Sequence, residues 1–185
     1  MKKTKNEDPK YPMTVTLSSG EEITIPKQSE FDDAWLRKHG CSLIAEYMAL
    51  QFLGVEKITL PGGKKVRPWP LHLLTWHKKH TPDEIFSKVT LRGVAKGIST
   101  LGGKKGSVIY SKYVTVSRIR AALASGAVVI MERKEPIHSI TLVKDGEVIY
   151  RLNAGKAVRT TPEAAAGTAT TSARYRGMII VRKTK

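Results

Sequence analysis

The chain has 185 residues, 41% hydrophobic and 26% charged, which is enough for one domain with a sizeable core. Lys and Arg number 32 against 16 Asp and Glu, so the formal net charge is +16 and anionic partners are favoured. The single cysteine excludes an internal disulfide. No apolar run reaches the ~18 residues that a membrane span needs.

The positive charge is scattered rather than concentrated. It falls in MKKTK, GGKKVR, HKKH, GGKKG and VRKTK, mostly at termini and glycine-flanked turns. There is no arginine-rich block and no aromatic-basic motif of an RNA-binding sheet. We therefore expect a solvated basic surface that an anionic polymer could contact, and we do not expect specific nucleic-acid binding. The opening MKKTKNEDPKYP lacks an apolar segment, which predicts a cytoplasmic protein, or a secreted one if a leader preceded this sequence.

The first elements follow in chain order. Residues 1–12 read as a tail, and residues 13–26 alternate apolar and polar side chains around Ser18-Ser19-Gly20, which predicts a hairpin. From Leu43 onward, apolar residues follow helical spacing until Gly54. We expect residues 1–26 to form a tail and hairpin, and residues 27–185 to form the main domain.

Three further helices are predicted. The first covers residues 70–80, and the second opens at Thr81, with Glu84 completing a capping box. Residues 99–107, STLGGKKGS, read as a loop. The third helix lies within residues 114–126, with Thr115 or Ser117 as its N-cap and Gly126 as its stop.

The second half of the chain is rich in strand-forming residues. Four segments, AVVIMER, IHSITLV, GEVIYRL and GMIIVRK, predict strands, and the Ala/Thr-rich stretch 160–173 reads as a surface excursion. Helices therefore come first and strands later. This order predicts an α+β fold with a helical lobe packed on an antiparallel sheet.

The only cysteine, Cys41, lies at the predicted start of the helix that contains Leu43. Unpaired backbone N–H groups in a first helical turn favour negative charge, which lowers a thiol's pKa and raises its reactive thiolate fraction. The alternative is an inert core cysteine. A nucleophile needs a base and a group that orients the base. His138 differs from the other histidines because it opens an apolar strand.

A hairpin supplies a partner for His138. If Asp145 and Gly146 form a two-residue loop, Lys144 faces Glu147, and counting back places His138 opposite Asn153. Directly opposed residues on one face have Cβ atoms about 4.5–5.5 Å apart. Asn153 would then accept the imidazole N–H and turn the other ring nitrogen toward Cys41.

The order of Cys at a helix start, His on a later strand and Asn one hairpin away resembles the papain-like cysteine peptidases. Within that group the chain most resembles the stand-alone relatives of the bacteriocin-processing peptidases, which remove double-glycine leaders. The resemblance runs from about residue 25 to residue 182 and rests on IPKQ, the Gly-Cys that opens a helix, ASGAVVI, IHSITLV, RLNAG and GMIIVRK.

The resemblance implies a cysteine peptidase that forms a thioester and needs no cofactor. It makes Cys41 the nucleophile, His138 the base, Asn153 its orienter and Gln28 an oxyanion-hole donor. It also implies a peptide or protein substrate. The chain departs from the family in reading Gly-Cys-Ser-Leu-Ile where Gly-Cys-Gly-Pro-Thr is common, and in having Asn153 followed by Ala where Asp-Pro is common.

Other functions stay open at this stage. A related amidase or acyltransferase would use the same residues, and a non-catalytic basic binding module would use the fold alone. A metal site at His72, His77 and His80 is disfavoured because their spacings of five and three do not match HExxH. The three tryptophans are expected to pack in the core or line a cleft wall: Trp35, Trp69 and Trp76.

Overall fold

Two layers make up the fold of the computed structural model, which describes residues 12–153, 155–166 and 174–184. N-terminal helices pack on a six-stranded antiparallel sheet, so the predicted α+β class is confirmed. The helices are α1 (Ala34–His39), α2 (Cys41–Phe52), α3 (Pro70–His80), α4 (Leu91–Gly102), α5 (Val116–Ala124) and α6 (Pro162–Ala166). Three single 3₁₀ turns are η1 (Gln28–Glu30), η2 (Pro82–Glu84) and η3 (Gly103–Lys105).

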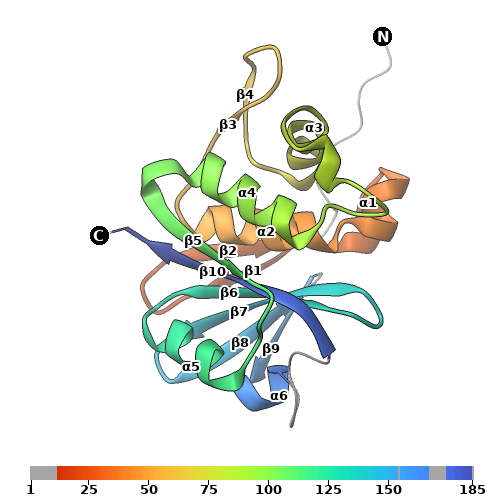
Figure 1. The fold of residues 1–185 in the computed structure, drawn as a ribbon. Coiled ribbons are helices and arrows are strands. Elements are labelled where there is room, and N and C mark those ends of the chain that lie inside the picture. Colours follow the sequence, from red (N-terminus) through yellow and green to blue (C-terminus); the bar gives the residue numbers. More distant parts are fainter. Residues whose placement is uncertain (1–11, 154, 167–173, 185) are drawn as a thin grey trace.

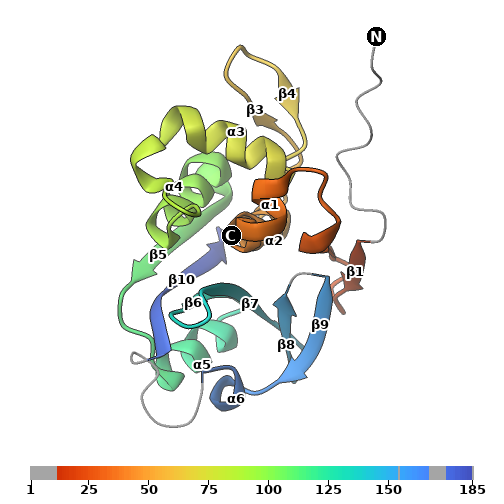
Figure 2. The same ribbon diagram turned by 90° about the vertical axis from the view of Figure 1, so that its right-hand side faces the viewer.

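The strands form one large sheet and two small ones. They are β1 (Met13–Thr16), β2 (Glu22–Ile25), β3 (Ile58–Thr59), β4 (Lys65–Val66), β5 (Gly106–Ser111), β6 (Val128–Arg133), β7 (His138–Asp145), β8 (Val148–Asn153), β9 (Lys156–Thr160) and β10 (Tyr175–Lys183). The large sheet has the order β5-β10-β6-β7-β8-β9. Helices α2, α3 and α4 lie on one face of it, and α5 and α6 lie on the other (Figures 1 and 2).

Each face of the large sheet has its own apolar core. On the α2 side the strands contribute Ile130, Val143 and Leu152. On the α5 side they contribute Met131, Ile140 and Leu142, among others. Side chains alternate between the two faces along a strand. The β7 residues two or four positions from Ile140 therefore point to the α5 side, and so do the β8 residues directly before and after Leu152.

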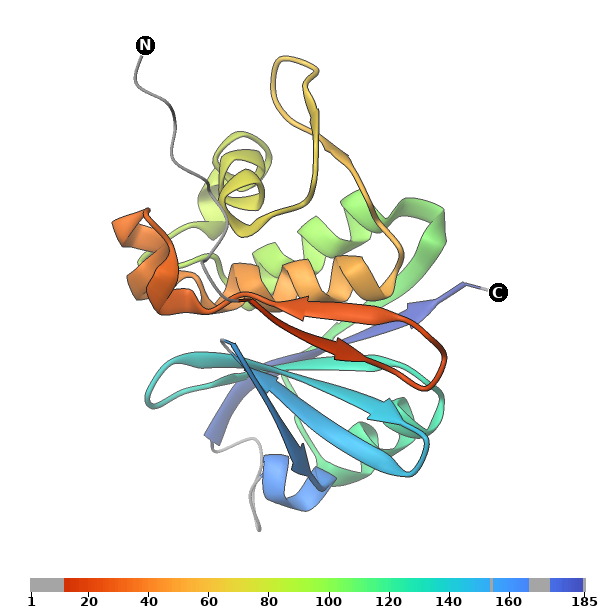
Figure 3. The same cartoon turned by 180° about the vertical axis from the view of Figure 1, so that it is seen from behind.

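The N-terminal hairpin is confirmed, and it packs into the main core. Leu17, Ile23 and Ile25 are buried in the same cluster as α2. The turn of the hairpin also docks on β7, because the Ser18 backbone N–H donates to Asp145 Oδ1 at 2.8 Å. Figure 3 shows β1 and β2 between α2 and the β7–β8 end of the sheet.

Three of the predicted helices are confirmed as α2, α3 and α5. Thr115, rather than Ser117, is the N-cap of α5, since its hydroxyl accepts from the Arg118 N–H at 3.3 Å. The four predicted strands correspond to β6, β7, β8 and β10. Within the stretch 160–173, residues 162–166 form α6, and residues 167–173 lie outside the described part of the chain.

The helix predicted to open at Thr81 is wrong. Residues 82–84 form only a 3₁₀ turn, and α4 begins at Leu91 with Thr90 as its N-cap. The Thr81 hydroxyl bonds the His77 ring instead of capping a helix. Glu84 turns away to accept from the Thr90 hydroxyl and to pair with Lys96. The side chains of Thr81 and Glu84 therefore bond other side chains and do not cap a helix.

The loop predicted at residues 99–107 is also wrong at both ends. Helix α4 continues through Gly102, and strand β5 begins at Gly106. Edge strands β5 and β9 were not predicted at all. In β9 the charged Lys156 and Arg159 are exposed, as is common in edge strands, whereas β5 exposes only Ser107 and Ile109.

The register of the β7–β8 hairpin differs from the prediction by two residues. Asp145 pairs with Val148 and Lys144 with Ile149, so the two-residue loop is Gly146-Glu147. Gly146 has φ +56°, which a residue without Cβ adopts readily at the first loop position. The last ladder pair is Thr141 with Leu152, so His138 does not face Asn153 directly. A shift of two residues keeps every side chain on the same face of the sheet.

No helix among the described residues is long and apolar enough to cross a membrane.

Candidate active site

Cys41 is the first residue of α2, and it follows α1 after a single glycine. Gly40 donates its N–H to the Leu36 carbonyl at 2.8 Å and closes α1. A Cβ at Gly40 would lie 2.5 Å from that same oxygen, so the direct junction of α1 and α2 requires glycine. The Gly-Cys pair thus places the cysteine in the first turn of a buried helix, as predicted.

His138 begins β7 and hydrogen-bonds Asn153, which ends β8. The bond joins His138 Nε2 to Asn153 Oδ1, so the Nε2–H donates to the amide oxygen. The two residues are diagonal rather than opposite across the strands, a distance that longer side chains can span. The predicted pair is therefore present although its predicted register is wrong, and Nδ1 is the ring nitrogen left for the thiol.

The Cys41 thiol and the His138 imidazole lie close enough to interact, and each changes the pKa of the other. Burial by itself raises the pKa of Cys41. The hydrogen bond from His138, the Ser139 backbone N–H and the charges of His138 and Lys88 outweigh it, so the pKa is lowered. The bond to Cys41 and the bond to Asn153 raise the pKa of His138 against the effect of burial. Both changes favour a thiolate–imidazolium pair.

A buried ion pair that the sequence reasoning missed lies beside the thiol. Lys88 and Glu132 are 7% and 2% exposed, and the Lys88 ammonium contacts the Glu132 carboxylate. Glu132 lies on β6 opposite Ser139, whose N–H bonds Cys41. The available signal was a glutamate inside the apolar run AVVIMER, since acidic residues are rarely buried without a partner.

Gln28 lies in η1 and is tied to the helix that precedes the cysteine. Its side-chain amide donates to the Arg37 carbonyl at 3.1 Å, one helical turn before Cys41. The neighbouring Lys27 packs against the turn after Asn153, because a Cβ at Gly155 would lie 2.9 Å from Lys27 Cβ. Gln28 is thus near both halves of the site, but its amide points to Arg37 in this structure.

A cavity of about 250 Å³ adjoins the His138–Asn153 pair. Its wall includes both of these residues, Tyr175 and three arginines, Arg133, Arg151 and Arg174. The arginines come from three different segments: Arg133 from β6, Arg151 from β8 and Arg174 from the position just before β10. The sequence reasoning did not single them out because only the sheet brings them together.

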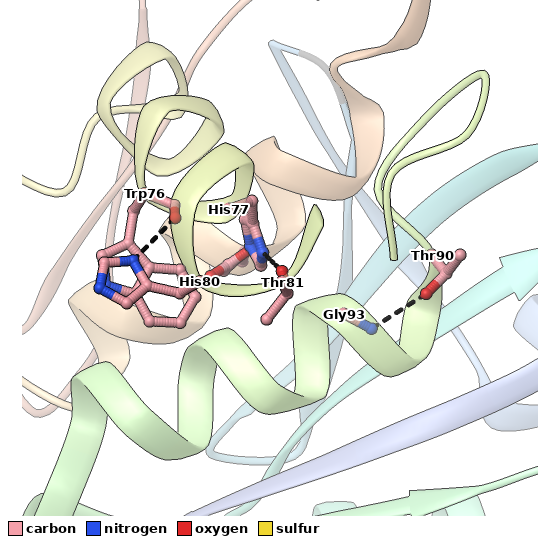
Figure 4. Close-up of polar contacts among 7 residues, drawn as sticks. Trp76, His77, His80, Thr81, Thr90 and Gly93 are labelled. Carbon is pink, nitrogen blue, oxygen red and sulfur yellow. Dashed lines mark hydrogen bonds and ion pairs between the residues drawn. The ribbon is translucent and has the colours of Figure 1, made fainter. Parts of the chain in front are cut away.

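The three histidines of α3 hydrogen-bond other groups of the protein, and only His77 is buried in the core. His77 bonds the Glu46 carboxylate at 2.7 Å. It also bonds the Thr81 hydroxyl at 2.7 Å, and His80 bonds the Trp76 carbonyl (Figure 4). His72 bonds the Arg67 carbonyl. Among the described residues no group of three or more His, Cys, Asp or Glu side chains could hold a metal ion.

The tryptophans pack as expected. Trp69 and Trp76 are buried, and Trp35 lies partly buried against the core. Comparison with models of known protein families and with curated proteins finds no match for this chain.

Proposed function

We propose that this chain is a papain-like cysteine peptidase that hydrolyses a peptide bond through a thioester intermediate. The observation that carries the proposal is that His138 interacts with the Cys41 thiol and hydrogen-bonds Asn153. Nucleophilic catalysis by a thiol needs these three roles, namely a thiolate, an acid–base and a residue that fixes the ring. The departures from the family after Cys41 leave these interactions intact.

In the proposed reaction the Cys41 thiolate attacks the peptide carbonyl carbon, and a C–S bond forms as the carbonyl electrons move to oxygen. The tetrahedral intermediate collapses and breaks the C–N bond. The His138 imidazolium gives its proton to the leaving amine. A water molecule then attacks the thioester, His138 accepts its proton, and the acid is released with the thiolate restored.

The negative oxygen of the intermediate needs hydrogen-bond donors. The backbone N–H of Cys41, in the first turn of α2, is one candidate. Gln28 is the second, and it would have to exchange its bond to the Arg37 carbonyl for one to the oxyanion. Donors at an active site are often misaligned without substrate, so the observed bond to Arg37 is compatible with this role.

The proposal is tested by the rate of iodoacetamide alkylation of Cys41 as a function of pH. We expect the wild-type rate to reach half its maximum well below the ordinary thiol pKa of about 8.5. In His138→Ala the midpoint should rise by about one pH unit or more, because the opposite charge is lost. His80→Ala, an exposed α3 variant, should behave as wild type. An ordinary midpoint in wild type and His138→Ala alike would contradict the proposal.

A peptide mixture then tests hydrolysis itself. Cleavage read by mass spectrometry should occur with wild type and disappear with Cys41→Ala. An activated thiol without any cleavage across a diverse mixture would favour the related amidase or acyltransferase on the same residues.

A further inference from the structure

The cavity beside His138 has an unusual balance of charge. Arg133, Arg151 and Arg174 line it, and no carboxylate is part of its wall. All three arginines line the same cavity as Tyr175. Burial raises the pKa of the Tyr175 hydroxyl, while the charges of the three arginines act to lower it. Three cations around a small cavity repel one another, and a bound anion relieves this repulsion.

The described part of the chain provides no carboxylate partner for these arginines. Arg133 donates to the backbone carbonyl of Glu135 at 3.5 Å, and none of the three takes part in an ion pair there. By contrast, Arg120 on α5 pairs with Glu163. As far as the described residues go, the guanidinium groups of Arg151 and Arg174 make no hydrogen bond or ion pair with the protein and can bind a ligand.

The position of the cavity relative to the thiol indicates which part of a substrate the cavity would contact. The His138 imidazole interacts with Cys41 and also forms part of the cavity wall. In the proposed reaction this imidazolium protonates the leaving amine. The leaving amine must therefore lie next to the His138 imidazole, and the same ring is part of the wall of the cavity that the arginines line.

We propose that the arginine cavity binds a carboxylate on the leaving-group side of the scissile bond, and that the enzyme selects acidic substrates at this position. This inference rests on the proposed function, because the direction of the leaving group follows from the role of His138. A carboxylate suits the site because guanidinium groups bind it with two parallel, charge-assisted hydrogen bonds. The same chemistry is offered by a chain-terminal carboxylate and by an Asp or Glu side chain.

The test uses dipeptides that mimic the released amine product and needs no turnover. Each is titrated into Cys41→Ala while the imidazole signals of His138 are followed by NMR. Glycyl-glutamine carries only a terminal carboxylate, glycyl-glutamic acid α-amide carries only a side-chain carboxylate, and glycyl-glutaminamide carries none. We expect one of the two acids to bind about tenfold more tightly than the neutral dipeptide, as a hydrogen bond to a charged group allows.

The arginine variants show whether the cavity is responsible. Arg151→Gln and Arg174→Gln, each in the Cys41→Ala background, should abolish the preference for the acid. Arg92→Gln, an exposed variant on α4, should keep it. Arg133 is left intact because its charge acts on the pKa of His138. Thermal melting of every variant confirms that the fold is retained.

The outcomes separate this inference from the proposed function. If both acids bind no better than the neutral dipeptide, or bind Arg151→Gln and Arg174→Gln as well as the parent, the inference is overturned even when Cys41 is an activated nucleophile. If the acid preference is present but the alkylation experiment finds an ordinary thiol, the cavity binds anions and the peptidase proposal fails. Whichever acid binds more tightly identifies the terminal or the side-chain carboxylate.

Discussion

Lys88 and Glu132 form an ion pair in the interior of the protein, next to the thiol of Cys41. Lys88 comes from the segment before α4, and Glu132 lies on β6, where the Arg176 side chain also approaches it, with Nε 3.9 Å from Oε1. The Lys88 charge lowers the pKa of Cys41 in addition to the larger effect of His138. The pair thus joins the helical layer to the sheet. Its lysine charge also acts on the thiol of the candidate site.

Replacing Lys88 separates its structural role from its effect on the thiol. Lys88→Met leaves a buried carboxylate without its main partner, which should cost about 3–5 kcal/mol of unfolding free energy. The double variant Lys88→Met/Glu132→Gln removes both charges and should recover most of this loss. In both variants the alkylation midpoint of Cys41 should move to higher pH. Denaturant unfolding and the alkylation profile measure the two effects, and a double variant with the wild-type profile would show that Lys88 is only structural.

The hydrogen bond between His138 and Asn153 predicts the shape of the pH profile. Activity needs the thiolate and the imidazolium together, so kcat/KM should be bell-shaped. On the acid limb the activity rises as the Cys41–His138 pair loses the thiol proton. On the alkaline limb it falls as the pair loses the imidazolium proton. Because Asn153 raises the pKa of His138, Asn153→Ala should move the alkaline limb to lower pH.

Asn153→Asp is the matched control for this shift. It adds a negative charge beside the ring, which favours the imidazolium, so the alkaline limb should move to higher pH than in wild type. Shifts in the same direction for Asn153→Ala and Asn153→Asp would contradict the assigned role. A loss of kcat with no movement of either limb would indicate that Asn153 only supports the fold.

Replacing Gln28 should lower the rate of turnover without changing the pKa of the Cys41 thiol. If its amide stabilises the oxyanion, Gln28→Ala should lower kcat by about 10²–10³-fold. The iodoacetamide profile should stay unchanged, because alkylation forms no oxyanion. Gln28→Ala also removes the bond to the Arg37 carbonyl, so thermal melting serves as the control. Equal loss of alkylation and turnover would mean that Gln28 acts by positioning α1 and Cys41 instead.

Gly97 on α4 allows the buried Glu46–His77 pair to form. A Cβ at this position would overlap Glu46 Oε1 and lie 3.0 Å from His77 Cε1. Gly97→Ala should therefore destabilise the protein by about 1–3 kcal/mol, although alanine has the higher helix propensity. Ser99→Ala on the exposed face of the same helix should change stability little. Urea unfolding compares the two, and a stabilised Gly97→Ala would disprove the close packing.

The pattern of residues along the chain determined the class of the fold and three members of the candidate site. Periodic apolar residues predicted α2, α3, α5 and the four central strands, because local periodicity reflects the buried face of each element. Cys41 at a helix start and His138 at a strand start followed from the same patterns. Asn153 was found through a register that is two residues off, and it was found correctly because a shift of two keeps the face.

The tertiary structure decided which partner each polar side chain takes, whether that partner is near to it or far from it in the sequence. Thr81 and Glu84 resembled a helix cap, but His77, Thr90 and Lys96 use their polar groups. Lys88 and Glu132 meet only when the helical layer packs on the sheet, and the three cavity arginines meet only when β6, β8 and β10 align. Local preferences are worth tenths of a kcal/mol to about 1 kcal/mol per residue, so burial and pairing between distant segments override them.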